Sequence, residues 1–304
     1  MGIDSPGLDD AALARAVDFA READTAQLTI AHRGEVVVEL ADDPDPLDVF
    51  AVQKVLVSAM CAIAEDRDLL RLDDPVADHL GTGWTQLDPG AEQRLTIERV
   101  LDMTTGVDQE LRPLGEVGVS WRYDNVSYNY LKTLLEIVSG RSMSELTEGW
   151  LLGPLGMTST RWVERQVTRP DGRAITGMLS TSSDLARYGA LVLAGGGDLV
   201  PAGHIARIGR PGSDENPSWG LCWWNNDQDH HRLPGSEGAV RPGPTVPAAP
   251  ADLLLARGAM ENRLYVVPSM ELVVARTFRA VSRDQRPVRF DQPFWELLLG
   301  SDAG

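Results

Sequence analysis

The sequence has 304 residues, 43% of them hydrophobic and 24% charged, with no low-complexity tract. Such a composition is typical of a folded globular protein, and the length suits one large α/β unit with a helical insertion. The formal net charge of −17 would repel a phosphate backbone or an anionic membrane surface, so we expect no nucleic-acid partner and no membrane association.

The start of the chain predicts a helix followed by a hairpin. Residues 9–23 show helical periodicity, and residues 25–42 read as two strands around a His-Arg-Gly turn. The opening stretch is acidic and amphipathic rather than basic and then apolar. It therefore resembles neither a signal peptide nor a membrane anchor, and we expect a cytoplasmic protein.

A long buried helix is predicted over residues 52–69, where apolar side chains recur at helical spacing. From about residue 70 to residue 210 the pattern is one of helices and loops with little strand alternation. Residues 251–278 give strand-like runs separated at Pro268-Ser269, and residues 290–300 predict a closing helix.

Strands at both ends with helices between them imply one antiparallel sheet built from both chain ends. We therefore predict an α/β (α+β) fold: this sheet, flanking helices and a helical subdomain, forming a single catalytic unit over residues 1–304. Residues 1–70 and 210–304 would form the sheet-containing subdomain and residues 71–209 the helical one. Residues 225–250 are rich in Pro and Gly and lack periodicity, and we expect this loop to border the site.

Several kinds of site are not supported by the sequence. It has no His-Glu-x-x-His, Gly-x-Ser-x-Gly, Walker-type or dinucleotide-binding motif, and the only clustered histidines, His230 and His231, lie in the irregular loop. We expect no metal and no cofactor. Cys61 and Cys222 fit free buried thiols better than a disulfide.

The best candidate for a catalytic site lies at the start of the predicted buried helix. Ala51 and Lys54 are three residues apart, so their side chains share one helix face, as in a Ser-x-x-Lys site whose serine is replaced by alanine. A lysine in apolar surroundings holds its proton less firmly and can deprotonate a serine hydroxyl. Only Lys54 and Lys132 among the 28 basic residues are lysines, so a lysine here could fill a role that arginine cannot; the alternative is a codon bias, which would explain the arginines but not the two lysines. The plainer reading of Lys54 is a snorkelling residue at a helix start.

A second candidate element follows at Tyr123 and Asn125, a Tyr-x-Asn spacing ahead of a predicted helix. Tyr123 could relay a proton with Lys54, and Asn125 could orient both the lysine and a substrate carbonyl. Taken alone, Tyr123 would more commonly be a buried loop tyrosine that packs on the helix.

With both elements in this order, the chain resembles serine hydrolases of the class C β-lactamase and penicillin-binding-protein type. The resemblance covers most of residues 25–280, including LLRLDDPVADHL, LTIERVLDMTTGV, GPLGMTSTRW and ITGMLSTSSDLARYGALVLAGGG. The segment ARGAMENRLYVVPSMELVVAR resembles the strand pair of the third motif, especially in the branch of esterases, D-amino-acid amidases and nylon-oligomer hydrolases. The resemblance implies an oxyanion hole at the backbone N–H groups of residue 51 and Ala259.

The chain departs from the family pattern twice. The nucleophile position holds Ala51, and the third motif reads Ala256-Arg257-Gly258 where Lys or His, then Thr or Ser, then Gly is usual. Because Lys54, Tyr123 and Asn125 all remain, we favour a deliberate serine-to-alanine substitution over a naturally inactive relative. We expect Arg257, Trp121 and Trp223 to contact substrate, although tryptophans at such places are often core residues.

The predicted function is serine-dependent hydrolysis of an ester or amide bond in a small molecule, with this exact chain inactive because of Ala51. An acyltransferase using an amine or alcohol acceptor is the nearest alternative. A naturally inactive β-lactamase-like binding protein is the alternative from another class, and a structural or assembly role is the third. The sequence does not fix the substrate or the oligomeric state.

Overall fold

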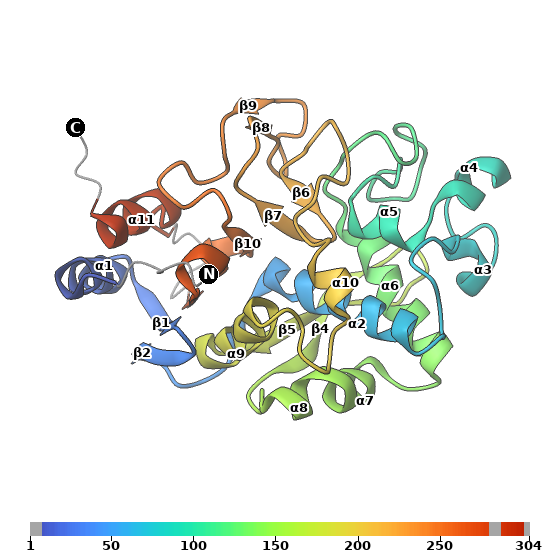
Figure 1. Cartoon of the computed structure of the whole chain (residues 1–304). Coiled ribbons are helices and arrows are strands. Elements are labelled where there is room, and N and C mark those ends of the chain that lie inside the picture. Colours follow the sequence, from blue (N-terminus) through green and yellow to red (C-terminus); the bar gives the residue numbers. More distant parts are fainter. Residues whose placement is uncertain (1–7, 280–286, 301–304) are drawn as a thin grey trace.

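A computed structural model describes residues 8–279 and 287–300 of the chain. Its centre is a seven-stranded antiparallel sheet in the order β2-β1-β12-β11-β10-β7-β6 (Figure 1). Two of these strands come from the start of the chain, β1 (Thr25–His32) and β2 (Glu35–Ala41). The other five come from its last third: β6 (Trp219–Gly220), β7 (Trp223–Asn225), β10 (Leu254–Arg257), β11 (Arg263–Val267) and β12 (Leu272–Phe278).

The expected sheet built from both chain ends is therefore confirmed. The β1–β2 hairpin turns at Arg33 and Gly34, whose φ angles are 53° and 81°, matching the predicted His-Arg-Gly turn. Between β11 and β12 lies the short η4 (Pro268–Met270), at the Pro-Ser break expected from the sequence.

Helices cover both faces of this sheet, and strand β11 shows why. Leu264 and Val266 point to one face, where they approach Gly189 of helix α9 (Ser182–Leu193). Tyr265 points to the other face and packs on Phe294 and Trp295 of helix α11 (Asp291–Leu299), which lies against α1 (Asp10–Glu22). The period-2 alternation of a strand thus holds a different layer on each side.

Most of the remaining helices lie across helix α2 (Gln53–Asp66) from the main sheet, as Figure 1 shows. All residues of α2 from Gln53 to Ala64 are buried, so this helix is apolar around nearly its whole circumference and lies inside the core. It packs on α6 (Asn125–Ser139). Around them are α3 (Val76–Leu80), α4 (Pro89–Arg94), α5 (Ile97–Leu101), α7 (Met143–Thr147), η2 (Glu148–Leu152), α8 (Gly153–Leu155) and α10 (Ala202–Ile205).

The range 71–209, expected to be the helical subdomain, also holds sheet-associated elements. Helix α9 packs against β1, β11 and β12 of the main sheet. A small second sheet in the order β3-β5-β4 joins β3 (Leu47–Asp48) to β5 (Ala174–Ser180) and β4 (Arg161–Thr168). The pattern of helices and loops in this range does not indicate which helices lie on a sheet.

Both cysteines are buried and free, as expected. Within the described part of the chain, no helix is long and apolar enough to cross a bilayer.

Candidate active site

A pocket of about 820 Å³ lies where the main sheet, helix α2 and helix α6 meet. Its walls include Ala51, Lys54, Tyr123, Asn125 and the segment from Arg257 to Ala259. Residues that the sequence places far apart are thus brought to one cavity.

Ala51 lies in a short turn of 3-10 helix, η1 (Phe50–Val52), which leads directly into α2. The preceding residue, Phe50, has a φ angle of 50°, a left-handed conformation that is unfavourable for a non-glycine residue. The Asp48 carboxylate stabilises this turn by accepting the Phe50 N–H at 2.8 Å, and Asp48 is itself paired with Arg165 at 2.7 Å. The strained turn presents residue 51 to the pocket, with its N–H among the first donors of the helical start.

Lys54 follows one turn later, and its ammonium group lies on the pocket floor. Its Nζ donates to Asn125 Oδ1 at 2.8 Å and lies 4.1 Å from the ring centre of Tyr128 and 5.0 Å from that of Tyr123. The side chain is only 3% exposed. Burial lowers the pKa of Lys54 to about 8, because desolvation disfavours the charged form.

Asn125 owes its position to the start of helix α6. Asp124 is the N-cap, and its carboxylate accepts from the N–H groups of Val126 and Ser127 at 2.8 and 3.2 Å. The Asn125 side chain, at the first helical position, reaches Lys54 across the pocket floor.

Tyr123, just before this cap, also lines the pocket. Among the described residues its hydroxyl has no hydrogen-bond partner, and Lys54 Nζ lies 5.0 Å from the centre of its ring. Burial raises the pKa of Tyr123, which keeps the phenol protonated. Because its pKa is lowered whereas that of Tyr123 is raised, Lys54 is better suited than Tyr123 to accept a proton near neutral pH.

The end of strand β10 comes very close to the turn that holds residue 51. A Cβ added to Gly258 would lie 2.3 Å from the Val49 carbonyl oxygen, so only glycine fits between the two backbones. Ala259 follows at the start of the 3-10 turn η3 (Ala259–Glu261), where a backbone N–H has no partner within its own turn. The N–H groups of residues 51 and 259 thus belong to two segments held in direct contact.

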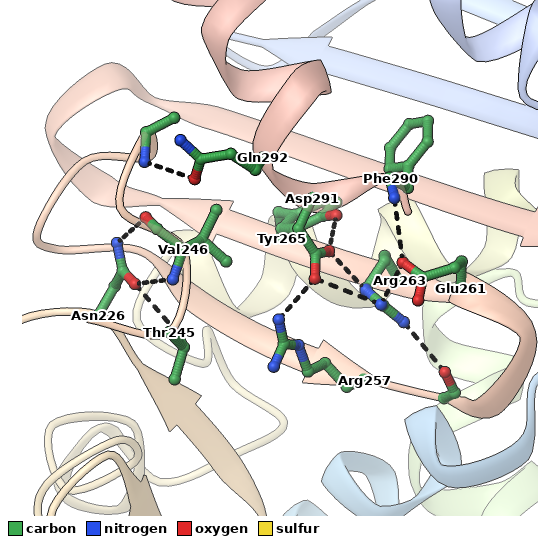
Figure 2. A network of polar contacts seen from close by, with 12 residues as sticks. Asn226, Thr245, Val246, Arg257, Glu261, Arg263, Tyr265, Phe290, Asp291 and Gln292 are labelled. Atoms are coloured by element: carbon green, nitrogen blue, oxygen red, sulfur yellow. Dashed lines mark hydrogen bonds and ion pairs between the residues drawn. The ribbon is translucent and has the colours of Figure 1, made fainter. Parts of the chain in front are cut away.

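Arg257, just before this glycine, belongs to a buried ion network shown in Figure 2. Asp291 at the start of α11 accepts from Arg257 at 2.5 Å, from Arg263 Nε at 2.6 Å and from the Tyr265 hydroxyl at 2.6 Å. Burial alone would raise the pKa of Asp291, but the charges of Arg263 and Arg257 hold it well below its usual range. Arg263 also donates to the Gly258 carbonyl at 3.0 Å and so fixes the peptide that leads to Ala259.

Comparison with known proteins identifies the family of the chain. The sequence profile of the β-lactamase family matches residues 11–249. The chain belongs to the β-lactamase family. It is 25% identical to an uncharacterized protein of Alkalihalophilus pseudofirmus, in a match covering 76% of this chain and 73% of that protein.

Solved structures share the β-lactamase-type fold at low sequence identity. A D-stereospecific amidohydrolase from Streptomyces sp. is 16% identical, with a TM-score of 0.69 and 97% of this chain and 100% of that one covered. A β-lactamase from Mycobacterium bovis is 19% identical, with a TM-score of 0.70 and coverage of 94% and 98%. A presumed 6-aminohexanoate-dimer hydrolase from Bacillus anthracis is 14% identical, with a TM-score of 0.69 and coverage of 94% and 80%.

The expectation that Trp121 and Trp223 contact substrate is not supported by the structure, because neither lines the pocket. Trp223 does not line the cavity: it is 1% exposed and stacks on Tyr188. Trp121 is 3% exposed and packs edge-on against Trp219 and Trp224, so it too is a core residue. Only Trp224 of this cluster contributes to the pocket wall. Alternation along β7 places neighbouring tryptophans on opposite faces, which the composition of the segment did not reveal.

The loop 225–250 does border the pocket, as expected. It carries the small strand pair β8 (His230–His231) and β9 (Arg241–Pro242). Its pocket-lining residues are His231, Leu233, Pro234, Arg241, Thr245, Val246 and Pro247.

The sequence interpretation missed Gln53, Asn129, Arg165 and Thr176, which also line the cavity. Gln53 lies inside the four-residue segment from Ala51 to Lys54, and Asn129 lies one helical turn after Asn125, so spacing alone could have suggested both. Arg165 and Thr176 come from β4 and β5, and no local signal connects those strands with the pocket.

Proposed function

We propose that the form of this protein with serine at position 51 hydrolyses an ester or amide bond in a small molecule through an acyl-serine intermediate. Lys54 takes the proton from the serine hydroxyl, Tyr123 relays it toward the leaving group, and Asn125 orients both Lys54 and the substrate carbonyl. The N–H groups of residue 51 and Ala259 stabilise the oxyanion. Arg257 and Trp224 contact the substrate at the pocket wall, since both line it.

The observation that carries this proposal is the buried Lys54 ammonium, one turn after residue 51 and hydrogen-bonded to Asn125 at 2.8 Å. Burying a lysine without a carboxylate partner destabilises the folded protein. Such groups are typical of functional sites, and Lys54 lies where a proton acceptor for the nucleophile is needed. We further propose that Ala51 replaces serine by deliberate substitution. Conversion of Ala51 to serine, followed by covalent labelling of residue 51, tests the function directly.

Two alternatives differ in what they predict. An acyltransferase would give a new ester or amide when amines or alcohols compete with water, because only the acceptor changes. A naturally inactive binding protein would keep ligand binding, seen as a rise in melting temperature, but would not gain turnover from a serine at position 51.

The pH dependence of the serine form follows from the pKa of Lys54. Only the neutral amine accepts a proton, and its fraction rises with pH up to the pKa of about 8. We expect kcat/KM for an uncharged ester to rise about tenfold per pH unit below that pKa and to level off above it. A stopped-time assay from pH 5.5 to 9.5, corrected for spontaneous hydrolysis, gives the profile. A flat profile would show that Lys54 is not the base.

Gly258 should be essential for the oxyanion donors. In the serine form, Gly258→Ala forces β10 away from the Val49 carbonyl, which separates the N–H groups of residues 51 and 259. We expect acylation by a fluorophosphonate to slow by a factor on the order of 10² to 10³, the loss typical of one oxyanion donor. Gly203→Ala is the matched control, because a Cβ there meets no atom within 4 Å. Equal labelling rates in the two variants would contradict the assignment.

A further inference from the structure

The second lysine of the chain, Lys132 of helix α6, lies buried behind the pocket and takes no part in the proposed reaction. Its side chain is 4% exposed, and four oxygens lie within hydrogen-bond distance of Nζ, which has three N–H donors to share among them: Gln53 Oε1 at 2.8 Å, Asn129 Oδ1 at 3.1 Å, and the Thr176 carbonyl and hydroxyl oxygens at 2.8 and 3.0 Å. No carboxylate of the described residues lies within ion-pair distance of this ammonium. Gln53, Asn129 and Thr176 all line the pocket, so Lys132 ties three of its walls together.

The chemistry of an ammonium group fixes how these partners are oriented. An ammonium has three donors and no acceptor, so each partner must turn an oxygen toward it. Asn129 accordingly presents Oδ1 to Lys132 and uses Nδ2 to donate to the Asn125 carbonyl at 2.7 Å. Gln53 presents Oε1 to Lys132, which leaves its Nε2 group pointing elsewhere.

The Nε2 group of Gln53 then has no acceptor among the described residues, and Gln53 itself lines the pocket. Gln53 is 5% exposed and lines the cavity beside Ala51 and Lys54, and no described residue accepts a hydrogen bond from its amide nitrogen. A nearly buried donor without a partner lowers the affinity for any ligand that does not supply an acceptor. Without Lys132, the amide would be free to turn over and offer its oxygen instead.

We propose that Lys132 is a positioning residue that holds the Gln53 amide with Nε2 toward the pocket, and that Gln53 selects substrates carrying a carbonyl-type acceptor oxygen apart from the scissile bond. This inference rests on the proposed function only in calling the ligand a substrate, because Gln53 would select which ligands bind. Arginine would not serve at position 132, since its planar fork is wider than one ammonium surrounded by four oxygens. Burial and the charge of Lys54 lower the pKa of Lys132, while the four surrounding oxygens favour its charged form.

The charge state of Lys132 can be observed without any ligand. Because the chain has only two lysines, protein labelled with ¹⁵Nζ-lysine gives two side-chain signals, and Lys132→Met identifies the one that belongs to Lys132. We expect Lys132 to give an ammonium signal at pH 7 with slow hydrogen exchange, because the buried group is surrounded by acceptor oxygens that favour the charged form. A neutral amine would overturn the inference, because an amine nitrogen can accept a hydrogen bond and would no longer fix the Gln53 amide.

Selectivity is tested on the Ala51 protein, which binds without turnover. The probes are anilides of a plain five- or six-carbon acyl chain, of the same chain with a keto group at successive positions, and of the same chain with an ammonium group. We expect one keto probe to bind on the order of 10-fold more tightly than the plain probe, the gain of one hydrogen bond. Gln53→Glu keeps a partner for Lys132 but offers the pocket an acceptor, so it should lose this preference and favour the ammonium probe.

Lys132→Met separates a positioning role from a purely structural one. If Lys132 positions Gln53, this variant loses the preference for the keto probe while its affinity for the plain probe changes little. A purely structural role would weaken binding of all probes together and would contradict the inference. Absence of any preference in the parent protein, whether the probes bind equally or not at all, contradicts it too. Turnover by the serine form with no such preference would overturn this inference and leave the proposed hydrolase function intact.

Discussion

Changing Ala51 to serine is expected to turn the protein into an active hydrolase. Alanine and serine differ by one hydroxyl group, and Lys54, Asn125 and the Gly258 contact already stand in the required arrangement. Loss of a serine nucleophile costs on the order of 10⁶ in kcat in a serine protease, so its return should raise turnover by several orders of magnitude. Little rearrangement is needed, because the turn that presents residue 51 is held by Asp48 and not by the side chain at position 51.

Covalent labelling distinguishes this outcome from any background hydrolysis. The Ala51→Ser protein should take one fluorophosphonate adduct, located at residue 51 by peptide mass, and should release product in a burst when deacylation is slow. The Ala51 protein is the control and should take no label there. Suppose that the serine form stays folded but neither reacts with the label nor turns over a broad panel of esters and amides. This result would support the view that the protein is naturally inactive, and it would contradict the hydrolase proposal.

Local patterns in the sequence were sufficient to predict the elements that carry the site. The apolar spacing after residue 52 predicts α2, and the alternation on both sides of Arg33-Gly34 predicts the β1–β2 hairpin. These signals are local, because a buried helix face or strand face repeats within a few residues. The family resemblance then placed the third motif in a strand pair, where the structure has β10 and β11.

What the sequence did not predict depends on contacts between distant segments. The approach of Gly258 to Val49 joins residues more than 200 positions apart, and nothing near Gly258 indicates the carbonyl that it faces. The left-handed conformation of Phe50 is likewise imposed from outside, by Asp48 and by Arg165 on β4. Lys132 stands out in the sequence because lysine is rare, but its contacts with Gln53 and Thr176 depend on how α2, α6 and β5 pack together.

Removing the Lys54 amine from the serine form should abolish most turnover while the protein stays folded. Lys54→Met keeps the length of the side chain and removes a buried charge that has no carboxylate partner, so the fold should tolerate it. Asn125, which loses its donor, is exposed and can bond to water. Because a general base contributes a factor on the order of 10² to 10⁴, kcat should fall by that amount with a much smaller change in KM.

Lys54→Arg is the variant that isolates proton acceptance from charge. Arginine retains the positive charge and can donate to Asn125, but it stays protonated at any pH that the protein survives. If Lys54 acts as the base, Lys54→Arg should be as inactive as Lys54→Met, and raising the pH should not restore it, whereas the lysine form gains activity up to about pH 8. Melting temperatures of the three forms show whether each is folded. Should Lys54→Arg retain turnover near that of lysine, the positive charge would be what the reaction requires, and Lys54 would not be the proton acceptor.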